Sequence, residues 1–198
     1  MPRESKFSND TLAERALHQF WTKGFYATSM DELVRSTGAS RHGIYTAFGG
    51  KKLLFYACFQ RYQDLIVTPA FSRVEKPDAG LAAIAAYFET QIALGEASGL
   101  PGPGCFVANS STEVAPHDAQ TLAKVAEHNL RLHNGFKNAL QNERKADGYI
   151  GQTDINLLAE VFVVFTNGLW SRSRTATNAA VLRQSVATFL NSMEAELT

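Results

Sequence analysis

The sequence predicts an all-α protein with about nine helices. Apolar residues recur at helical spacing along most of the chain. No segment shows the alternation of apolar and polar residues that marks a half-buried strand. The clearest break, residues 98–104, holds prolines and glycines that cannot continue a helix. Together, these patterns favour helices that pack on one another.

The first helix is expected from about Asn9 to Lys23. Ser8 or Asn9 can cap its start, and Gly24 can end it with left-handed backbone. Its apolar residues fall on one side of the helix: Leu12, Ala16, Leu17, Phe20 and Trp21.

Two short helices joined by a tight turn follow. Ser29 and Glu32 have the spacing of a capping box, in which each side chain bonds to the backbone N–H of the other. The turn occupies residues 37–39, and the next helix is expected over residues 41–48. Gly49-Gly50 ends that helix.

The remaining helices are longer and are separated by breaks. Pro69 and Pro77 bracket the first connection, and Pro116 is expected to open the longest helix. Asp147-Gly148 follows that helix. These helices are expected over residues 51–67, 78–98, 105–113, 116–145, 154–174 and 178–197.

The two short helices form a helix-turn-helix, whose second helix enters the major groove of DNA. The residues that would meet base edges there are Ser40, Arg41, His42 and Gly43. Arg41 can pair bidentately with guanine, and Gly43 lets the helix approach DNA closely. Hydroxyl and ammonium groups that can reach phosphates are carried by Tyr45, Thr46, Lys51 and Lys52.

Residues 24–51 resemble the DNA-binding signature of TetR-family regulators. The matching runs are Gly24-Phe25-Tyr26-Ala27-Thr28-Ser29-Met30-Asp31-Glu32-Leu33, Thr37-Gly38-Ala39-Ser40, Gly43-Ile44-Tyr45-Thr46-Ala47-Phe48 and Lys51. The resemblance implies that Thr28 touches a phosphate. The full DNA-binding set it suggests is Thr28, Ser29, Ser40, Arg41, His42, Gly43, Tyr45, Thr46 and Lys51. Lys52 departs from the family pattern, which often has an acidic residue there.

The resemblance also implies two domains and a function. Residues 1–50 would be a three-helix DNA-binding head, and residues 51–198 a helical domain for ligand binding and dimerisation. The chain would repress transcription from a palindromic operator until a small-molecule or reactive effector releases it. Residues 1–52 hold eight Lys and Arg against five Asp and Glu, while the remainder holds eleven against fourteen. A basic head suits phosphates, although so small an excess is common by chance.

The last two helices are expected to form a homodimer interface. Their apolar residues cover more than one face: Leu157, Leu158, Val161, Phe162, Val164, Phe165, Leu169 and Trp170, then Ala180, Val181, Val186, Phe189, Leu190 and Met193. A helix apolar on two faces buries one inside the protomer and one against a partner. An apolar monomer core would give the same pattern.

An effector pocket is expected among the central helices. Its candidate lining residues combine aromatic rings with a few polar groups: Phe59, Tyr62, Phe88, Gln91, Cys105, Phe106, Asn109, His133, Phe162 and Trp170. Aromatic stripes on helices pack in a core more often than they line a ligand site.

Cys105 allows two interpretations. It starts a helix after the glycine- and proline-rich loop, where N–H groups stabilise a thiolate. The segment Gly104-Cys105-Phe106-Val107-Ala108-Asn109 resembles a TetR subgroup in which some members sense electrophiles or oxidants through a cysteine at this place. A free cysteine is nevertheless more often a small buried apolar residue, which is the interpretation we favour.

No catalytic or metal-binding motif is recognisable. The sequence has no His-Glu-x-x-His, no Gly-x-Ser-x-Gly and no phosphate-binding glycine loop. His128 and His133 are five residues apart, which is wrong for one helical face. We therefore expect no cofactor, no metal and no enzymatic activity. The alternatives are a helical enzyme or small-molecule carrier with an incidental hairpin, and a DNA-binding protein without a ligand.

A cytoplasmic protein without a membrane segment is expected. No apolar stretch reaches the roughly 20 residues that cross a bilayer. Residues 1–6 are polar, unlike a secretory signal. Cys58 and Cys105 do not suggest a disulfide scaffold.

Overall fold

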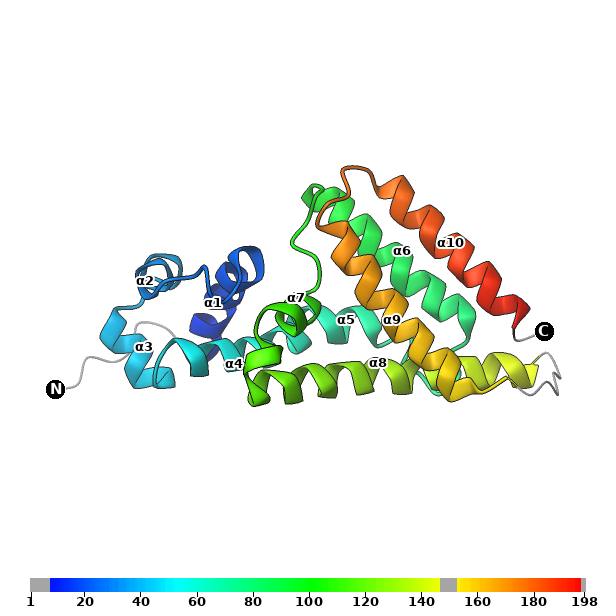
Figure 1. Cartoon of the computed structure of the whole chain (residues 1–198), viewed down its shortest axis with the longest axis horizontal. Helices are drawn as coiled ribbons and strands as arrows, with labels where there is room; N and C mark the ends of the chain where they lie inside the picture. Colours follow the sequence, from blue (N-terminus) through cyan, green and yellow to red (C-terminus); the bar gives the residue numbers. More distant parts are fainter. Residues whose placement is uncertain (1–7, 147–152, 197–198) are drawn as a thin grey trace. The chain divides into compact units, whose positions relative to one another are not determined.

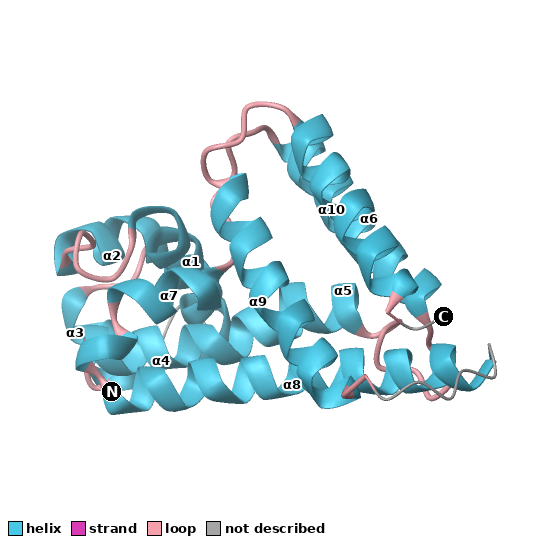
Figure 2. Cartoon of the chain, turned by 45° about the vertical axis from the view of Figure 1, so that its right-hand side comes forward, coloured by secondary structure: helices cyan, strands magenta, loops and turns pink. Residues whose placement is uncertain are grey.

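The computed structural model describes residues 8–146 and 153–196. Every regular element within these ranges is a helix, and no strand occurs in them (Figure 2). The all-α fold class is therefore confirmed. Two compact units make up the chain, the first from residues 1–67 and 106–125 and the second from residues 68–105 and 126–198.

Unit 1 contains the expected head together with two later segments. Its elements are α1 (Asn9–Lys23), α2 (Met30–Thr37), α3 (Arg41–Phe48), α4 (Lys51–Tyr62), the π-helix η1 (Gln63–Val67), α7 (Phe106–Glu113), the 3-10 helix η2 (Ala115–His117) and the start of α8 (Ala119–Ala146). Helix α1 packs against α2 and α4, and α4 also contacts α3 and α7 (Figure 1). This division by compactness differs from the boundary predicted after residue 50.

Aromatic rings form the core of unit 1. The ring of Phe55 on α4 packs edge-on against Phe20 of α1, with centroids 5.2 Å apart. On its other sides, Phe55 contacts Phe25, which follows α1, and Phe106 of α7. Because one α4 side chain meets three separate segments, α4 and α7 complete the core that the three-helix head needs.

Unit 2 is built on a second aromatic core. It contains α5 (Thr68–Phe71), α6 (Leu81–Ser98), most of α8, α9 (Ile155–Ser173) and α10 (Ala179–Ala195). Helix α10 lies beside α6 and also contacts α9 (Figure 1). Rings in contact with at least one other ring are Phe71, Tyr87, Phe88, Phe136, Phe162, Phe165, Trp170 and Phe189. A Cβ at Gly135 would lie 2.5 Å from the Phe71 ring, so glycine lets α5 approach α8.

The structure changes the boundaries of two predicted helices. The helix expected over residues 51–67 leaves α-geometry at Gln63, passes through η1 and resumes as α5. The longest helix begins at Ala119 and not at Pro116, which lies inside the 3-10 turn η2. Asp118 sets the true start, because its Oδ2 accepts hydrogen bonds from the backbone N and the hydroxyl of Thr121.

Smaller differences concern helix ends. Helix α6 starts at Leu81 and α7 starts at Phe106, so each begins one to three residues later than predicted. The break at Asp147-Gly148, residues 1–6 and Leu197 lie outside the described residues. No helix of the described part is long and apolar enough to cross a membrane.

Candidate nucleic-acid interface

The turn between α2 and α3 is closed by backbone and hydroxyl groups. Gly38 adopts a left-handed φ of 72°, and its N–H donates to the carbonyl of Val34. The Thr37 hydroxyl donates to Leu33 O at 2.6 Å and accepts from Ala39 N. These contacts hold the two helices at a fixed angle, as a helix-turn-helix requires.

Both helices start with a capped N-terminus. Ser29 and Glu32 form the predicted capping box at α2, with both reciprocal bonds present. Ser40 caps α3 by accepting from Gly43 N at 3.0 Å. The exposed Ser29 and Ser40 hydroxyls thus already take part in bonds at the helix ends. Glycine suits position 43, since a Cβ there would be 3.3 Å from Ser40 Oγ.

The first turns of α3 carry the exposed side chains of the predicted interface. Arg41 and His42 are exposed, and Tyr45 and Thr46 follow on the same short helix. Tyr45 is 50% exposed, and one edge of its ring lies beside Gly50. Arg41 is paired with Asp31 of α2 at 2.8 Å. His42 Nε2 lies 3.5 Å from the hydroxyl of Thr46.

Thr28 lies elsewhere than the resemblance implied. Its side chain is fully buried, and its hydroxyl donates to Gly24 O at 2.6 Å. Its backbone N–H donates to Phe25 O. In this structure Thr28 therefore closes the turn before α2, and its side chain is not on the surface that Arg41 occupies.

The two lysines at the start of α4 have different environments. Lys51 Nζ lies 4.3 Å from the centre of the Phe25 ring. Partial burial lowers the pKa of Lys51, and the charges of Glu113 and Glu32 act in the opposite direction. The exposed Lys52 pairs with Asp118, whose carboxylate also accepts from the Tyr56 hydroxyl.

Glu113 and Asp118 were not predicted as parts of this region. Glu113 accepts hydrogen bonds from the backbone N–H groups of Phe25 and Tyr26. The cationic neighbour Lys52 and further hydrogen bonds hold the pKa of Asp118 well below its usual range, despite partial burial. These contacts span more than sixty residues of sequence, so no spacing pattern could have indicated them.

The predicted effector residues form two groups. In unit 1, Phe59 and Tyr62 both contact the ring of Phe106, and Asn109 lies on the same helix as Phe106. In unit 2, the predicted residues are Phe88, Gln91, Cys105, His133, Phe162 and Trp170. Phe88 contacts the Trp170 ring there, and the indole N–H of Trp170 lies 3.3 Å from the Tyr87 hydroxyl. Burial raises the pKa of Tyr87.

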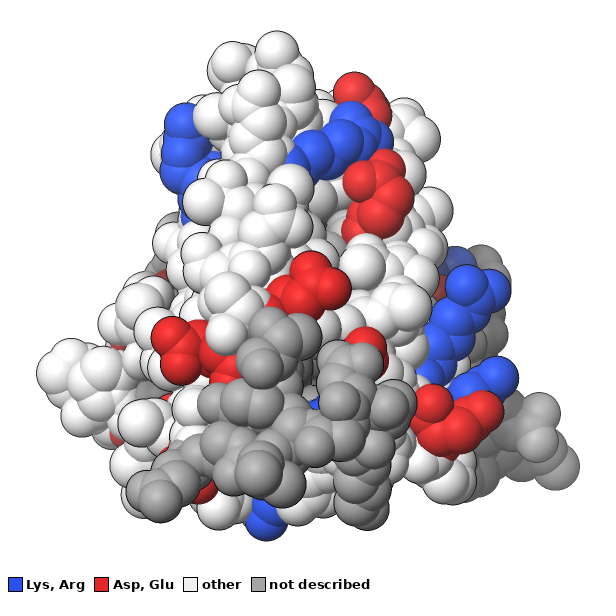
Figure 3. Space-filling model, turned by 90° about the vertical axis from the view of Figure 1, so that its right-hand side faces the viewer, with Lys and Arg blue, Asp and Glu red and all other residues white. Residues whose placement is uncertain are grey.

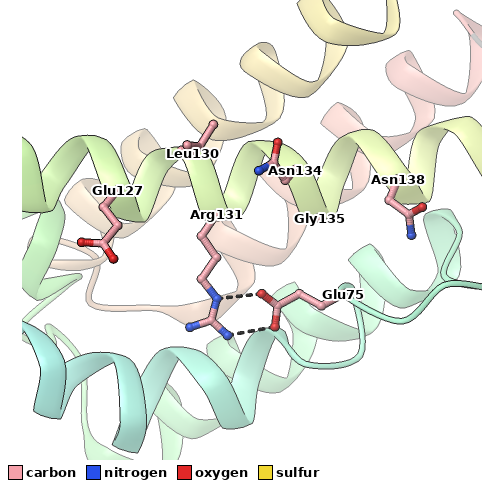
Figure 4. Close-up of a pocket in the computed structure, with 7 residues that line it drawn as sticks. All are labelled: Glu75, Glu127, Leu130, Arg131, Asn134, Gly135 and Asn138. Atoms are coloured by element: carbon pink, nitrogen blue, oxygen red, sulfur yellow. Dashed lines mark hydrogen bonds and ion pairs between the residues drawn. The ribbon is translucent and has the colours of Figure 1, made fainter.

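Unit 2 also contains an open groove of about 450 Å³ along α8 (Figure 4). Arg131 and Glu75 face each other across it in a bidentate ion pair, and Arg131 also donates to the Thr68 hydroxyl. The groove is lined by Glu75, Glu127, Leu130, Arg131, Asn134, Gly135 and Asn138. None of the predicted effector residues is among them.

Neither cysteine is at the surface. Cys58 is buried in α4 and its Sγ lies 3.2 Å from Leu54 O. Burial raises the pKa of the Cys58 thiol well above its usual value. Cys105 is 5% exposed and directly precedes α7. Within the described ranges, no three His, Cys, Asp or Glu residues lie together as a metal-binding group.

Comparison with known proteins links this geometry to a family. Residues 12–58 match the model of bacterial regulatory proteins, tetR family. This match covers α1 to α3 and most of α4. It therefore includes every residue of the predicted DNA-binding set.

Two curated relatives extend the similarity beyond the head. The HTH-type transcriptional repressor ComR of Escherichia coli (strain K12) is 27% identical over 190 residues, which are 95% of this chain and 90% of ComR. The uncharacterized HTH-type transcriptional regulator YezE of Bacillus subtilis (strain 168) is 26% identical over 164 residues, covering 80% of this chain and 82% of YezE.

Solved structures share the whole fold. A cysteine mutant of the TetR family transcriptional regulator CifR, complexed with 26 bp of double-strand operator DNA, has a TM-score of 0.81 and 18% identity. The match covers 96% of this chain and 98% of that one. A TetR family regulator from Cytophaga hutchinsonii has a TM-score of 0.79, 18% identity and coverage of 96% and 92%. Residues 12–58 of the chain thus carry the DNA-binding segment of the tetR family of bacterial regulatory proteins, and the fold along nearly its whole length is that of solved tetR-family regulators.

Proposed function

We propose that this chain is a DNA-binding transcriptional repressor that leaves a palindromic operator when a small-molecule or reactive effector binds. The observation that carries the proposal is the exposed first half of α3, held on a capped helix-turn-helix inside the family segment. ComR, a relative along most of the chain, is named a transcriptional repressor. A place in the cytoplasm, where operator DNA lies, is part of the proposal.

The side chains at the start of α3 would contact the edges of the bases. Arg41 has the guanidinium that pairs with guanine, and His42 and Ser40 lie beside it on the exposed side. Tyr45 and Thr46 then donate hydroxyls to phosphates, and Lys51 adds a positive charge. Thr28 keeps a supporting role, because its hydroxyl is committed to Gly24 O.

A homodimer through α9 and α10 would supply the two heads that a palindrome needs. Leu157 and Val164 of α9 are each 63% exposed, and Val161 lies between them on the same face. Exposed apolar residues at i, i+4 and i+7 form a stripe that a second copy can cover. In the view that faces this side, residues other than Lys, Arg, Asp and Glu form broad areas between a few charged side chains (Figure 3).

The dimer can be tested with one charge in the stripe. Val164→Asp should convert the dimer to a monomer in sedimentation velocity, because a carboxylate would be buried without a partner. Leu94→Asp is the matched control, since Leu94 of α6 is also exposed but lies outside the stripe. A dimer that survives Val164→Asp would place the interface elsewhere.

The effector would bind among the aromatic side chains of unit 2. Phe88, Phe162 and Trp170 lie in one network of ring contacts, and α6 carries the polar groups of Tyr87 and Gln91 together with Phe88. Such a site suits a compact, largely apolar molecule. The effector must bind the released state of the protein more tightly than the DNA-bound state, since a ligand with equal affinity for both states does not change their populations.

DNA selection tests the function directly. The wild-type chain is used to enrich duplexes from a random library, and the enriched duplex is then titrated at several salt concentrations. Specific binding should weaken steeply with salt, and Arg41→Ala and Tyr45→Phe should both reduce it. Arg73→Ala, an exposed arginine of unit 2, serves as the control.

The main alternative is a helical enzyme or carrier with an incidental hairpin. It predicts that no duplex is enriched and that Arg41→Ala changes nothing. The exposure of Arg41, His42 and Tyr45 together argues against an incidental hairpin, whose surface has no reason to gather these groups.

A further inference from the structure

The last residue of α7, Glu113, binds the backbone of the turn that follows α1. Its Oε2 accepts from Phe25 N at 3.0 Å, and its Oε1 accepts from Tyr26 N at 2.8 Å. One carboxylate therefore binds two successive N–H groups from a segment 87 and 88 residues away in sequence. Charge-assisted bonds of this kind are stronger than neutral ones.

The turn is shaped to receive this carboxylate. Gly24 has a φ of 91°, which is strained for any residue with a side chain. A Cβ at Gly24 would lie 2.8 Å from both carboxylate oxygens of Glu113. Glycine is thus needed here for its backbone angle and for the space that Glu113 occupies.

The same turn determines where α2 begins. The Thr28 hydroxyl donates to Gly24 O, so a hydrogen bond joins the two ends of the turn. Ser29 then caps α2, and Asp31 of that helix forms an exposed ion pair with Arg41 of α3. A displacement of the turn would therefore move the start of α2 and, through it, the helix that presents Arg41.

Glu113 also acts on the lysine at the start of α4. The Phe25 ring, whose backbone N–H is bonded to Glu113, lies under the Lys51 ammonium at 4.3 Å. The Glu113 charge favours the protonated form of Lys51 and so raises its pKa, against the larger effect of burial. One carboxylate is thereby linked to the helix-turn-helix and to a proposed phosphate contact.

We propose that Glu113 is a positioning residue for DNA binding, which sets the turn between α1 and α2 and places Phe25 beneath Lys51. It touches no base or phosphate itself, and its effect passes through Phe25, Tyr26 and Gly24. The proposal rests on the proposed function, because it assigns a role within DNA binding. It gives α7, which the family model does not cover, a defined part in that activity.

The experiment compares Glu113→Ala and Glu113→Gln with the wild-type chain. Glutamine retains one acceptor oxygen, so it should keep part of the effect and stay folded. Glu127→Gln is the control, because Glu127 is an exposed glutamate of α8 whose loss removes the same charge. Circular dichroism and the thermal unfolding midpoint establish that each variant is folded at the binding temperature.

Two readouts separate positioning from simple stabilisation. Affinity for the duplex enriched by the wild-type chain should fall about tenfold or more in Glu113→Ala, as expected for lost charge-assisted bonds. Affinity for a scrambled duplex should fall less than affinity for the enriched duplex, because Lys51 is only one of several phosphate contacts that supply it and no base is read there. Amide hydrogen exchange should accelerate at Phe25 and Tyr26, with Glu113→Gln intermediate in both measurements and Glu127→Gln unchanged.

The outcomes that would overturn the proposal are distinct from a failure of the function. The wild-type chain could enrich a duplex that the Glu113→Ala variant binds as tightly as wild type does. That result would support the proposed repressor function and refute the role of Glu113. An equal loss on both duplexes would also refute it, because the effect would then not pass through the helix that presents Arg41 to the bases. Failure of the wild-type chain to enrich any duplex would refute the proposed function itself, and the role in DNA binding with it.

Discussion

The guanidinium of Arg41, at the start of α3, lies 2.8 Å from a carboxylate oxygen of Asp31 on α2. Both side chains are exposed, at 57% and 72%. An ion pair so open to water contributes little to stability. Asp31 therefore orients the Arg41 side chain along the surface of the helix-turn-helix. Breaking this ion pair so that the guanidinium can bind a base costs little free energy.

Asp31→Asn should strengthen DNA binding. The substitution removes a negative charge close to the expected phosphates and frees Arg41, so affinity for enriched and scrambled duplexes should both rise, by about threefold. Fluorescence anisotropy at fixed salt measures this, with Glu127→Gln as the control. Weaker binding to the enriched duplex alone would mean that Asp31 orients Arg41 for base reading.

The neighbouring lysines at the start of α4 should behave differently towards DNA. Lys51→Met should reduce the slope of log affinity against log salt by about 0.9 for each head, the value for one phosphate contact. Lys52→Met should leave the slope unchanged, since Lys52 is paired with Asp118. A slope that falls equally in both variants would show that Lys52 leaves Asp118 when DNA binds.

Asp118 should contribute to the stability of unit 1. Asp118→Ala removes the cap from Thr121 at the start of α8 and the acceptor for the Tyr56 hydroxyl. The free energy of unfolding should fall by about 1–2 kcal/mol from the cap alone, as measured in urea. The Asp118→Asn variant keeps an acceptor oxygen and should lose less of the free energy of unfolding. Equal losses in the two variants would show that the charge of Asp118 matters more than its hydrogen bonds.

His128 should make the stability of the protein depend on pH between about 6.5 and 4. Burial, at 4% exposure, and the charge of Arg131 lower the pKa of this imidazole from 6.5 to about 4. The unfolded chain binds the proton first as the pH falls, so stability is complete above pH 6.5 and decreases towards pH 4. The expected loss from pH 7 to pH 5 is about 2 kcal/mol.

Urea unfolding of wild type and His128→Gln at the two pH values measures this loss. The variant should lack the His128 part of the pH dependence, whatever its stability at pH 7. An identical dependence in both proteins would assign it to carboxylates, of which Asp118 titrates at lower pH because its pKa is held down by Lys52.

The two thiols should be slow to react in the folded protein. Cys58 is fully buried and Cys105 nearly so. A disulfide reagent such as DTNB should modify both only as fast as the chain opens, and quickly in denaturant. Fast modification that disappears in Cys105→Ser would contradict this and restore the sensor interpretation of Cys105.

Local chemistry made the head predictable. The capping box at Ser29, the cap at Ser40 and the left-handed Gly38 each involve residues within four positions of one another. Their spacing alone was enough to predict α2, α3 and the turn between them. The family resemblance rested on the same short-range pattern and was confirmed over residues 12–58.

Long-range contacts could not be predicted in this way. No local sequence pattern connects Glu113 with Phe25 or Asp118 with Lys52, and only the fold brings these pairs together. The burial of Thr28 could not be predicted for a related reason, since it depends on the turn around Gly24. The effector residues stay a prediction, because an aromatic side chain at helical spacing looks the same in a core and in a pocket.

The π-helical residues 63–67 shift the phase of the helical repeat. Buried side chains recur every three or four positions as far as Tyr62, and the next is Val67, five positions on, followed by Phe71. The extra residue changes the direction of the side chains that follow on this helix by about 100° around its axis, relative to an uninterrupted α-helix. In unbroken α-geometry the same residues would turn Phe71 away from Tyr87 and Phe136, whereas a chain one residue shorter would keep Val67 and Phe71 at four-residue steps from Tyr62. The π-helical turn therefore accommodates one additional residue without changing which side chains of this helix are buried.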